Sequence, residues 1–277
     1  MTAFKTNIIN VYGEQGKAWL TDLPELTHEI GYKWGLSGLT AVSNLSYNYV
    51  LSGFQGNQPI ILKLGMDVDG LKREAAALKA FEGFGAVGIL AESAGTLLLE
   101  HAVPGTSLKS YCPHQNAQAI HIACTVMQQL HQAPPPQGNF PHMRHWMTAL
   151  DKEWEIPQLY LKKARHLRDK LLEMSVNPVL LHGDLHHENI LRHGERWCVI
   201  DPKGVIGAPI NEVWAFIMDI EKDTQFVADF FDFDVQEVRD WYFVHLILAA
   251  CWNLEDHIRP QLFLELADKA YLLTSSP

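Results

Sequence analysis

Asp184, Asn189 and Asp201 are the residues of this sequence whose types and spacing most clearly suggest chemistry. They lie in residues 180–204, which read LLHGDLHHENILRHGERWCVIDPKG. A carboxylate can accept a proton from a hydroxyl group, and amide and carboxylate oxygens are ligands that Mg²⁺ prefers. Together these groups suit phosphoryl transfer, in which catalysis rests on positioning, on metal charge and on a residue that orients the nucleophile.

Two short apolar runs separate Asn189 from Asp201, and a His193-Gly194 turn lies between them. This pattern predicts a β-hairpin that pairs residues 190–192 with residues 196–199. A hairpin returns the chain to its starting point, so Asn189 and Asp201 would end on the same side. One Mg²⁺ ion could then contact both side chains.

Two other interpretations of this stretch are open. His182, His186 and His187 could ligate a transition metal, although zinc sites favour sets of cysteine and histidine or an H-E-x-x-H helix. The hairpin could also be purely structural.

The spacing is similar to that of protein kinases, in which H-R-D-x-x-x-x-N is followed by D-F-G. The polar positions are kept in His182-Gly183-Asp184, in Asn189 and in residues 201–204, which read DPKG. Gly183 replaces the arginine that reads an activation-loop phosphate, and Pro202 replaces the phenylalanine. These differences favour a kinase that acts on small molecules.

The stretches HGDLHHENI (182–190) and WCVIDPKGVIGAP (197–209) resemble the aminoglycoside phosphotransferase superfamily, and within it the streptomycin 6-kinases and hydroxyurea-type resistance kinases. The resemblance is specific over residues 180–214. It implies a two-lobed protein-kinase-like α+β fold, with a small antiparallel-sheet N-terminal lobe and a larger helical C-terminal lobe. Many members continue to G-D-P-x-x-D, whereas residues 207–212 here read GAPINE, so the structural role of that segment is not expected to carry over.

Lys63 interrupts the otherwise apolar strand expected at residues 59–64, and a buried ammonium group is costly unless it is paired. Asp67 or Asp69 can cap the helix that follows, and Glu74 lies on its apolar face. A Lys63–Glu74 pair would place the lysine on the α and β phosphates of ATP, like the strand lysine and helix glutamate of protein kinases. The alternative is an edge-strand lysine that points to water.

The segment 43–48, SNLSYN, lies where a kinase has its glycine-rich phosphate loop. It contains no G-x-G-x-x-G. Ser43, Ser46 and the local backbone N–H groups could still hold phosphate oxygens. An ordinary polar turn is the alternative.

A buried strand is expected at residues 96–100, where Pro104 and Gly105 follow and end it. By the resemblance, this is the hinge between the lobes, and the backbone from Glu100 to Ala102 would bind the adenine edge. We expect a nucleotide-binding lobe in residues 1–99, a hinge in 100–104, and a helical lobe with the catalytic and acceptor sites in 105–277.

The expected helices come from apolar spacing and from proline and glycine breaks. In the N-terminal region we expect a helix at residues 10–20, a break at 21–24 and a second short helix. The helices expected in the C-terminal region cover residues 116–130, 142–154, 157–174, 210–220, 235–257 and 262–273.

Composition narrows the classes of function. The net charge of −10 over 277 residues argues against nucleic-acid binding and is compatible with a cationic substrate. Neither a secretory signal nor an apolar run of bilayer length is evident, and the four cysteines form no C-x-x-C pair. We therefore expect a cytoplasmic protein with free thiols and no membrane partner.

The predicted function is ATP- and Mg²⁺-dependent phosphorylation of a hydroxyl on a small, cationic molecule, with a streptomycin-type aminoglycoside implied by the resemblance. Acids of the helical lobe would contact such an acceptor; the candidates are Glu212, Asp219, Glu255 and Asp256. The alternative for each of them is an exposed acid that contacts only solvent. The alternatives are a kinase for another metabolite, a protein kinase and a non-catalytic nucleotide-binding scaffold. A protein kinase is disfavoured because residues 201–212 are too short for an activation segment.

Overall fold

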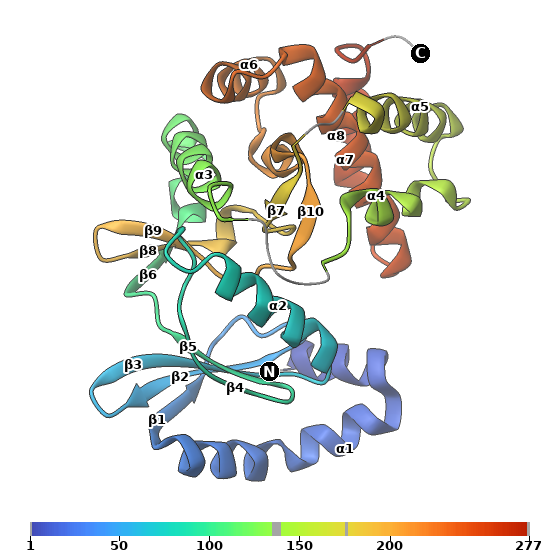
Figure 1. Cartoon of the computed structure of the whole chain (residues 1–277). Coiled ribbons are helices and arrows are strands. Elements are labelled where there is room, and N and C mark those ends of the chain that lie inside the picture. The colour runs from blue at the N-terminus through green and yellow to red at the C-terminus, as the bar shows by residue number, and fades with distance from the viewer. Residues whose placement is uncertain (1, 135–139, 175–176, 276–277) are drawn as a thin grey trace.

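The computed structural model describes residues 2–134, 140–174 and 177–275. A five-stranded antiparallel sheet near the N-terminus faces a larger helical region, which is the two-lobed protein-kinase-like α+β architecture expected from the sequence (Figure 1). The strand order is β1-β2-β3-β5-β4. The strands are β1 Leu36–Ala41, β2 Tyr49–Gln55, β3 Gln58–Leu64, β4 Ile89–Ser93 and β5 Thr96–Glu100.

Strand β3 is central, and its second half is buried, including Lys63. Its partner β2 is joined to it by a two-residue turn, because Gln55 pairs with Gln58. Gly56 in that turn has φ 59°, which a residue without Cβ adopts at little cost.

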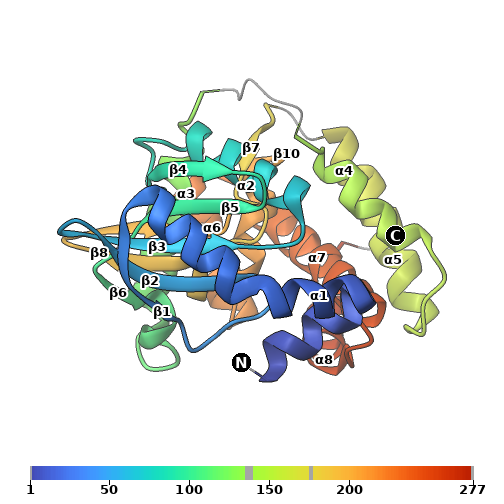
Figure 2. The ribbon, with the colours of Figure 1, turned by 90° about the horizontal axis from the view of Figure 1, so that it is seen from below.

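Helix α1 (Thr2–Trp34) corrects the expected arrangement of a helix at 10–20, a break at 21–24 and a second helix. The chain bends at Gly13 (φ 57°), while Pro24 lies inside the helix. Phe4, Ile8, Leu23 and Ile30 are buried against the sheet, so tertiary packing outweighs the low helix propensity of proline. Figure 2 shows α1 in front of the sheet, on the face away from the helical lobe.

Helix α2 (Val68–Ala80) packs against β4 and β5 on the opposite face of the sheet (Figure 1). Asp67 caps it by accepting a hydrogen bond from the Gly70 N–H at 2.8 Å. Leu71, Ala75 and Leu78 are buried, and Glu74 lies on the same face. The cap and the 3.6-residue spacing therefore direct Glu74 inward, as predicted.

The chain enters the helical lobe through β6 (Pro104–Ser107), which pairs with the hairpin of β8 (Ile190–His193) and β9 (Arg196–Val199). Val199 also exchanges backbone hydrogen bonds with Gly85 and Val87, at 2.8 and 3.1 Å. The hairpin is thus attached to the segment that follows α2 as well as to the helical lobe.

Helix α7 (Val235–Glu255) is the centre of the helical lobe, as its apolar run predicts, and it is buried along most of its length. Helix α6 (Ile220–Phe231) was not expected; Asp219 caps it, and its Val227 and Ala228 are buried. The other helices are α3 Asn116–Leu130, α4 Met143–Trp146, α5 Gln158–Met174 and α8 Gln261–Tyr271, with 3₁₀ helices at Leu108–Tyr111 (η1), Met147–Asp151 (η2), His187–Asn189 (η3) and Pro209–Phe216 (η4).

A small two-stranded sheet is formed by β7 (Val179–Leu181) and β10 (Val205–Gly207), which flank the predicted catalytic residues in the sequence. Leu181 pairs with Val205, so the residues that follow β7 and precede β10 emerge side by side. These residues are His182 and Gly204.

Among the helices that the structure describes, none is long and apolar enough to cross a membrane. All four cysteines are free, as the absence of C-x-x-C pairs predicted.

Candidate active site

The β8–β9 hairpin forms as the sequence predicts, with Ile190 opposite Val199 and His193 opposite Arg196. Gly194 takes the turn with φ 56°. At the open end, the Ile200 N–H donates to the Asn189 carbonyl at 3.1 Å. Asn189 and Asp201 are thereby brought to the same end of the hairpin.

His182 connects the loop that precedes the hairpin to the loop that follows it. Its ring is fully buried, and burial lowers its pKa below the ordinary value, so the imidazole is neutral. Nε2 lies 2.8 Å from the Ile200 carbonyl and donates to it, while Nδ1 accepts from the Asp184 N–H at 3.2 Å. The His182 carbonyl accepts from Lys203 N at 2.8 Å and Gly204 N at 3.1 Å.

The Asp184 side chain is exposed, and the Asp184 backbone carbonyl orients the Asn189 side chain. The Asn189 Nδ2 amide donates to the Asp184 carbonyl at 2.8 Å, which leaves the Asn189 Oδ1 atom available to a cation. His186 lies with Nε2 3.9 Å from Asp184 Oδ1. The carboxylate predicted to accept a proton and the amide oxygen predicted to bind Mg²⁺ are thus held by one short loop.

The three histidines of this loop do not act together as metal ligands. Both ring nitrogens of His182 are engaged, and His187 packs on Phe216 with ring centroids 4.8 Å apart. Within the described ranges, no group of three or more histidine, cysteine, aspartate or glutamate side chains could hold a metal ion. The geometry therefore disfavours the transition-metal interpretation.

Lys63 forms an ion pair with Glu74, as the sequence predicts, and a second ion pair with Asp201. Its Nζ lies 2.8 and 2.7 Å from the two Glu74 carboxylate oxygens and 3.0 Å from Asp201 Oδ1. Asp201 has φ 60°, a left-handed conformation that aspartate tolerates better than most residues. This network joins the sheet, α2 and the end of the hairpin.

Burial and charge oppose each other in this network. Burial disfavours the charged lysine, but Asp201 and Glu74 outweigh it and raise the pKa of Lys63. Burial raises the pKa of Glu74 against the opposing charge of Lys63. Burial also acts against the charged form of Asp201, yet Lys63 holds the pKa of Asp201 below its usual value. Lys63 and Asp201 are therefore charged at neutral pH.

A cleft of about 560 Å³ opens onto Lys63 and Asp201 between the two lobes. Its apolar walls come from both lobes and include Val42, Val50, Ile61, Leu99, Leu191 and Ile200. Glu100, Ala102 and Ser46 also line it. Ser43 is exposed and does not belong to the described lining of the cleft.

The Glu100 side chain contacts the hairpin. Its carboxylate lies 3.0 Å from His193 Nε2 and accepts from the Gly88 N–H at 3.2 Å. His193 Nδ1 in turn accepts from the Val103 N–H at 3.0 Å. The side chain therefore holds the connection between the lobes, and only the backbone of Glu100 and Ala102 stays a prediction for adenine binding.

Glu212 corrects one expectation, because it is not a free acid that could contact an acceptor. It is 3% exposed, and its two oxygens lie 2.9 Å from the Gly183 N–H and 2.8 Å from His131 Nε2. Although residues 207–212 lack the family aspartate, Glu212 anchors the loop that carries Asp184. The sequence interpretation missed His131, whose helical position gave no sign of a partner 81 residues away.

The other three acids considered for the acceptor are not among the described residues that line the cavity of about 210 Å³ beside Asp184, whose wall includes Trp146, Trp214 and Trp252. Asp219 caps α6 and accepts from the Lys222 N–H at 3.1 Å, and Glu255 pairs with Lys152 at 2.8 Å. Asp256 ends α7 through its backbone N–H, and its side chain is exposed.

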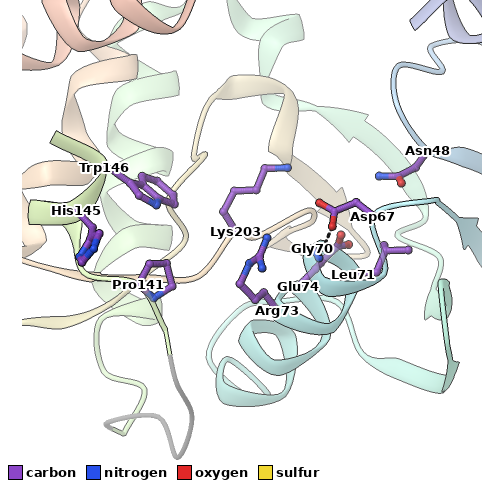
Figure 3. A pocket seen from close by; sticks show the side chains of 10 residues that line it. All are labelled: Asn48, Asp67, Gly70, Leu71, Arg73, Glu74, Pro141, His145, Trp146 and Lys203. Carbon is purple, nitrogen blue, oxygen red and sulfur yellow. Dashed lines mark hydrogen bonds between the residues drawn. The ribbon is translucent and has the colours of Figure 1, made fainter. Parts of the chain in front are cut away.

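A second pocket of about 560 Å³ lies between α2 and α4. Figure 3 shows Arg73 and Glu74 of α2 on one side, His145 and Trp146 of α4 on the other, and Lys203 between them. This pocket carries charges of both signs.

Comparison with known proteins identifies relatives of this chain. The family model of the aminoglycoside/hydroxyurea antibiotic resistance kinases matches residues 42–257. A streptomycin 3''-kinase from Klebsiella pneumoniae is 32% identical over 166 residues, which are 58% of this chain and 60% of that protein. A streptomycin 6-kinase from Streptomyces glaucescens is 23% identical over 274 residues, with 88% of this chain and 87% of that protein covered.

A solved structure supports the fold. The aminoglycoside phosphotransferase APH(4)-Ia superimposes with a TM-score of 0.70 at 14% identity, over 92% of this chain and 100% of that chain. A thermostable mutant of that protein has been solved as a ternary complex with ADP and hygromycin B. At this identity the likeness concerns the fold alone.

Proposed function

This chain belongs to the aminoglycoside/hydroxyurea antibiotic resistance kinase family, and we propose that it transfers the γ-phosphoryl group of ATP, with Mg²⁺, to a hydroxyl of a small molecule. The observation that carries this proposal is the convergence of Lys63 on both Glu74 and Asp201 at the cleft between the lobes. Asp184 and Asn189 lie in the adjoining loop, so every residue type that phosphoryl transfer requires is close by.

Each residue has a role that its surroundings support. Lys63 binds the α and β phosphates, and Glu74 holds the lysine in place. Asn189 Oδ1 and the Asp201 carboxylate are the Mg²⁺ ligands, and both are oxygen donors that suit a hard cation. When bound, Mg²⁺ neutralises negative charge on the phosphate oxygens during transfer.

Asp184 accepts the proton of the acceptor hydroxyl while that oxygen attacks the γ-phosphorus atom, and ADP leaves with the bridging oxygen. The exposed position of Asp184 gives the acceptor access to it. Glu212 and His182 fix the loop that carries Asp184, which supports the orientation that such a base requires. Adenine binds between the apolar walls of the cleft.

Streptomycin is the first acceptor that we propose, because streptomycin kinases are relatives of this chain. The test is the mass of each acceptor after incubation with the protein, ATP and Mg²⁺, with streptomycin first and hydroxyurea second. We expect streptomycin to gain one phosphoryl group. If only another metabolite gains it, phosphoryl transfer stands and the streptomycin assignment is wrong.

A protein kinase and a non-catalytic scaffold are less well supported. From Asp201 the chain runs through β10 directly into η4, which leaves no room for an activation segment. A scaffold does not require Asp184, Asn189, Lys63 and Asp201 to be kept together, yet all four are present.

A further inference from the structure

The pocket of about 560 Å³ between α2 and α4 borders two other cavities. It shares Asn48 with the cleft between the lobes, where the nucleotide is proposed to bind. It shares Trp146 with the cavity beside Asp184, where an acceptor hydroxyl would lie. A phosphoryl group that moves from the cleft to that hydroxyl is therefore transferred at the edge of this pocket.

Lys203 enters the pocket from a backbone that is held on two sides. The N–H groups of Lys203 and Gly204 both donate to the His182 carbonyl, at 2.8 and 3.1 Å. Gly204 has φ 67°, and a Cβ at this position would lie 2.6 Å from the Phe140 ring and 3.1 Å from the Ala77 side chain of α2. The glycine thus lets the chain pass close to α2, and the side chain of Lys203 starts from a fixed position.

The Lys203 side chain is exposed and extends into the pocket (Figure 3). Among the residues that the structure describes, its Nζ atom has no partner in a hydrogen bond or a close ion pair. Glu74 and Asp201 are bound to Lys63 instead, at 2.7 and 3.0 Å. The charge of Lys203 acts on both carboxylates, more weakly than that of Lys63. Its ammonium group is therefore close to the Lys63 network and available to another anion.

The loop that carries Asp184 supplies no lysine or arginine of its own, because residues 182–190 read HGDLHHENI. Phosphoryl transfer spreads negative charge over the oxygens of the transferring group, and fixed cations stabilise that charge. Lys63 is bound to Glu74 and Asp201 and is assigned to the α and β phosphates. A cation for the γ-phosphoryl group must come from another element.

Two cations line the pocket at this junction, Lys203 and Arg73. Arg73 is an exposed residue of α2, in the N-terminal lobe. Lys203 is bonded through its backbone to His182, which also accepts a hydrogen bond from the Asp184 N–H at 3.2 Å. Lys203 is therefore the cation that is fixed relative to the predicted proton acceptor.

We propose that Lys203 is a catalytic residue whose ammonium group contacts the γ-phosphoryl group and stabilises it during transfer. The proposal rests on the proposed function, because it requires a nucleotide in the cleft. The acceptor oxygen bonds to the γ-phosphorus atom while the bond from that atom to the β–γ bridging oxygen breaks. ADP keeps the electron pair of the broken bond, and Asp184 receives the hydroxyl proton. Lys203 keeps its own protons and donates hydrogen bonds to the non-bridging γ oxygens.

The first test compares two nucleotides that differ in the γ group. The affinities of MgADP and of MgAMP-PNP, an unreactive analogue of ATP, are measured by titration calorimetry for the wild type and Lys203→Met. The variant should bind MgAMP-PNP at least about tenfold more weakly and MgADP less than about twofold more weakly, because a charge-assisted hydrogen bond is lost only with the γ group. Equal losses for both nucleotides, or no loss for either, overturn the proposal.

Two other lysines provide controls for charge alone. Lys72 is exposed on α2, lies 3.7 Å from Asp69 and is not among the described residues of the pocket, so Lys72→Met should change neither affinity. Lys109 lines the cleft from η1, which follows β6 and the connection between the lobes, so Lys109→Met should change both affinities by the same factor. A loss specific to MgAMP-PNP in Lys109→Met, without one in Lys203→Met, would overturn the assignment of Lys203.

Kinetics separate a catalytic role from a structural one. Lys203→Met should lower the kcat of phosphoryl transfer at least about 100-fold while the KM of the acceptor changes little. Lys203→Arg keeps the charge and should recover most of the affinity for MgAMP-PNP. An unchanged kcat in Lys203→Met overturns the proposal. If the wild type binds neither nucleotide, the proposed function fails; if it binds both and Lys203→Met affects them equally, only the assignment of Lys203 fails.

Discussion

Lys63 is the residue at which the two lobes meet. Its position in an apolar strand predicts a partner, and the apolar spacing of the following helix places Glu74 on the inward face. The two residues are 11 apart in the sequence. Asp201 is 138 residues away, and no local periodicity relates it to Lys63. The sequence therefore predicted half of this network, and the other half depends on how the hairpin folds against the sheet.

A double-mutant cycle tests the Lys63–Glu74 pair in solution. Lys63→Ala and Glu74→Ala should each lower ATP turnover, and the double variant should lose less than the sum, because the two changes remove one ion pair. The expected coupling is about 0.5–3 kcal/mol, measured from kcat/KM. Simple addition of the two effects would mean that the pair does not act together on ATP.

Asp201→Ala tests the metal role of that residue. Loss of a charged ligand should abolish Mg²⁺-dependent turnover, while the fold persists because the Asp201 side chain is only partly buried. Turnover and nucleotide affinity are measured across a Mg²⁺ titration. Near wild-type turnover at saturating Mg²⁺ would contradict the assignment.

At the scale of elements, prediction succeeded where local spacing decides the structure. The hairpin at residues 190–199, α2 and α3 follow from alternating or helical apolar patterns. It failed for α1, where buried contacts with the sheet carry the helix past Pro24, and for α6. The link from His131 through Glu212 to Gly183 joins three separate elements, so no single pattern contains it.

The N-cap of α2 is an element whose stability can be tested. Asp67→Ala removes the acceptor of the Gly70 N–H and should lower the free energy of unfolding by about 1 kcal/mol. Asp69→Ala is the matched control, since Asp69 is exposed and lies in the first turn without serving as the cap residue. Denaturant titration of both variants measures the difference. Equal effects would show that the cap contributes nothing specific.

At the scale of the whole molecule, the acidic net charge of −10 suggested a cationic acceptor met by surface acids. In the structure Asp219 caps α6, Glu255 pairs with Lys152, and Glu212 supports the loop that carries Asp184. Overall charge could not show this, because it does not specify which carboxylates remain free. Trp146, Trp214 and Trp252 line one cavity although they come from separate elements, and no pattern in the sequence groups them.

Nucleotide binding between the lobes should stabilise the entire fold. With free MgATP at 100 times its Kd, the free energy of unfolding should rise by about 2.7 kcal/mol, which corresponds to a Tm increase of roughly 5 °C or more. Thermal denaturation with and without MgATP measures this. Chelation of Mg²⁺ should remove most of the increase in the wild type. An identical increase with and without Mg²⁺ would argue against metal ligands in the cleft.

The central claim is that Asp184 serves as the proton acceptor of a phosphoryl transfer. The most direct measurement is the rate at which an acceptor, streptomycin first, gains the mass of one phosphoryl group from ATP, compared between the wild type and Asp184→Asn. Because the variant keeps the shape and loses the base, the rate should fall on the order of 10²–10⁴-fold while ATP affinity changes little. An Asp184→Asn protein that phosphorylates the acceptor at the wild-type rate would contradict the claim.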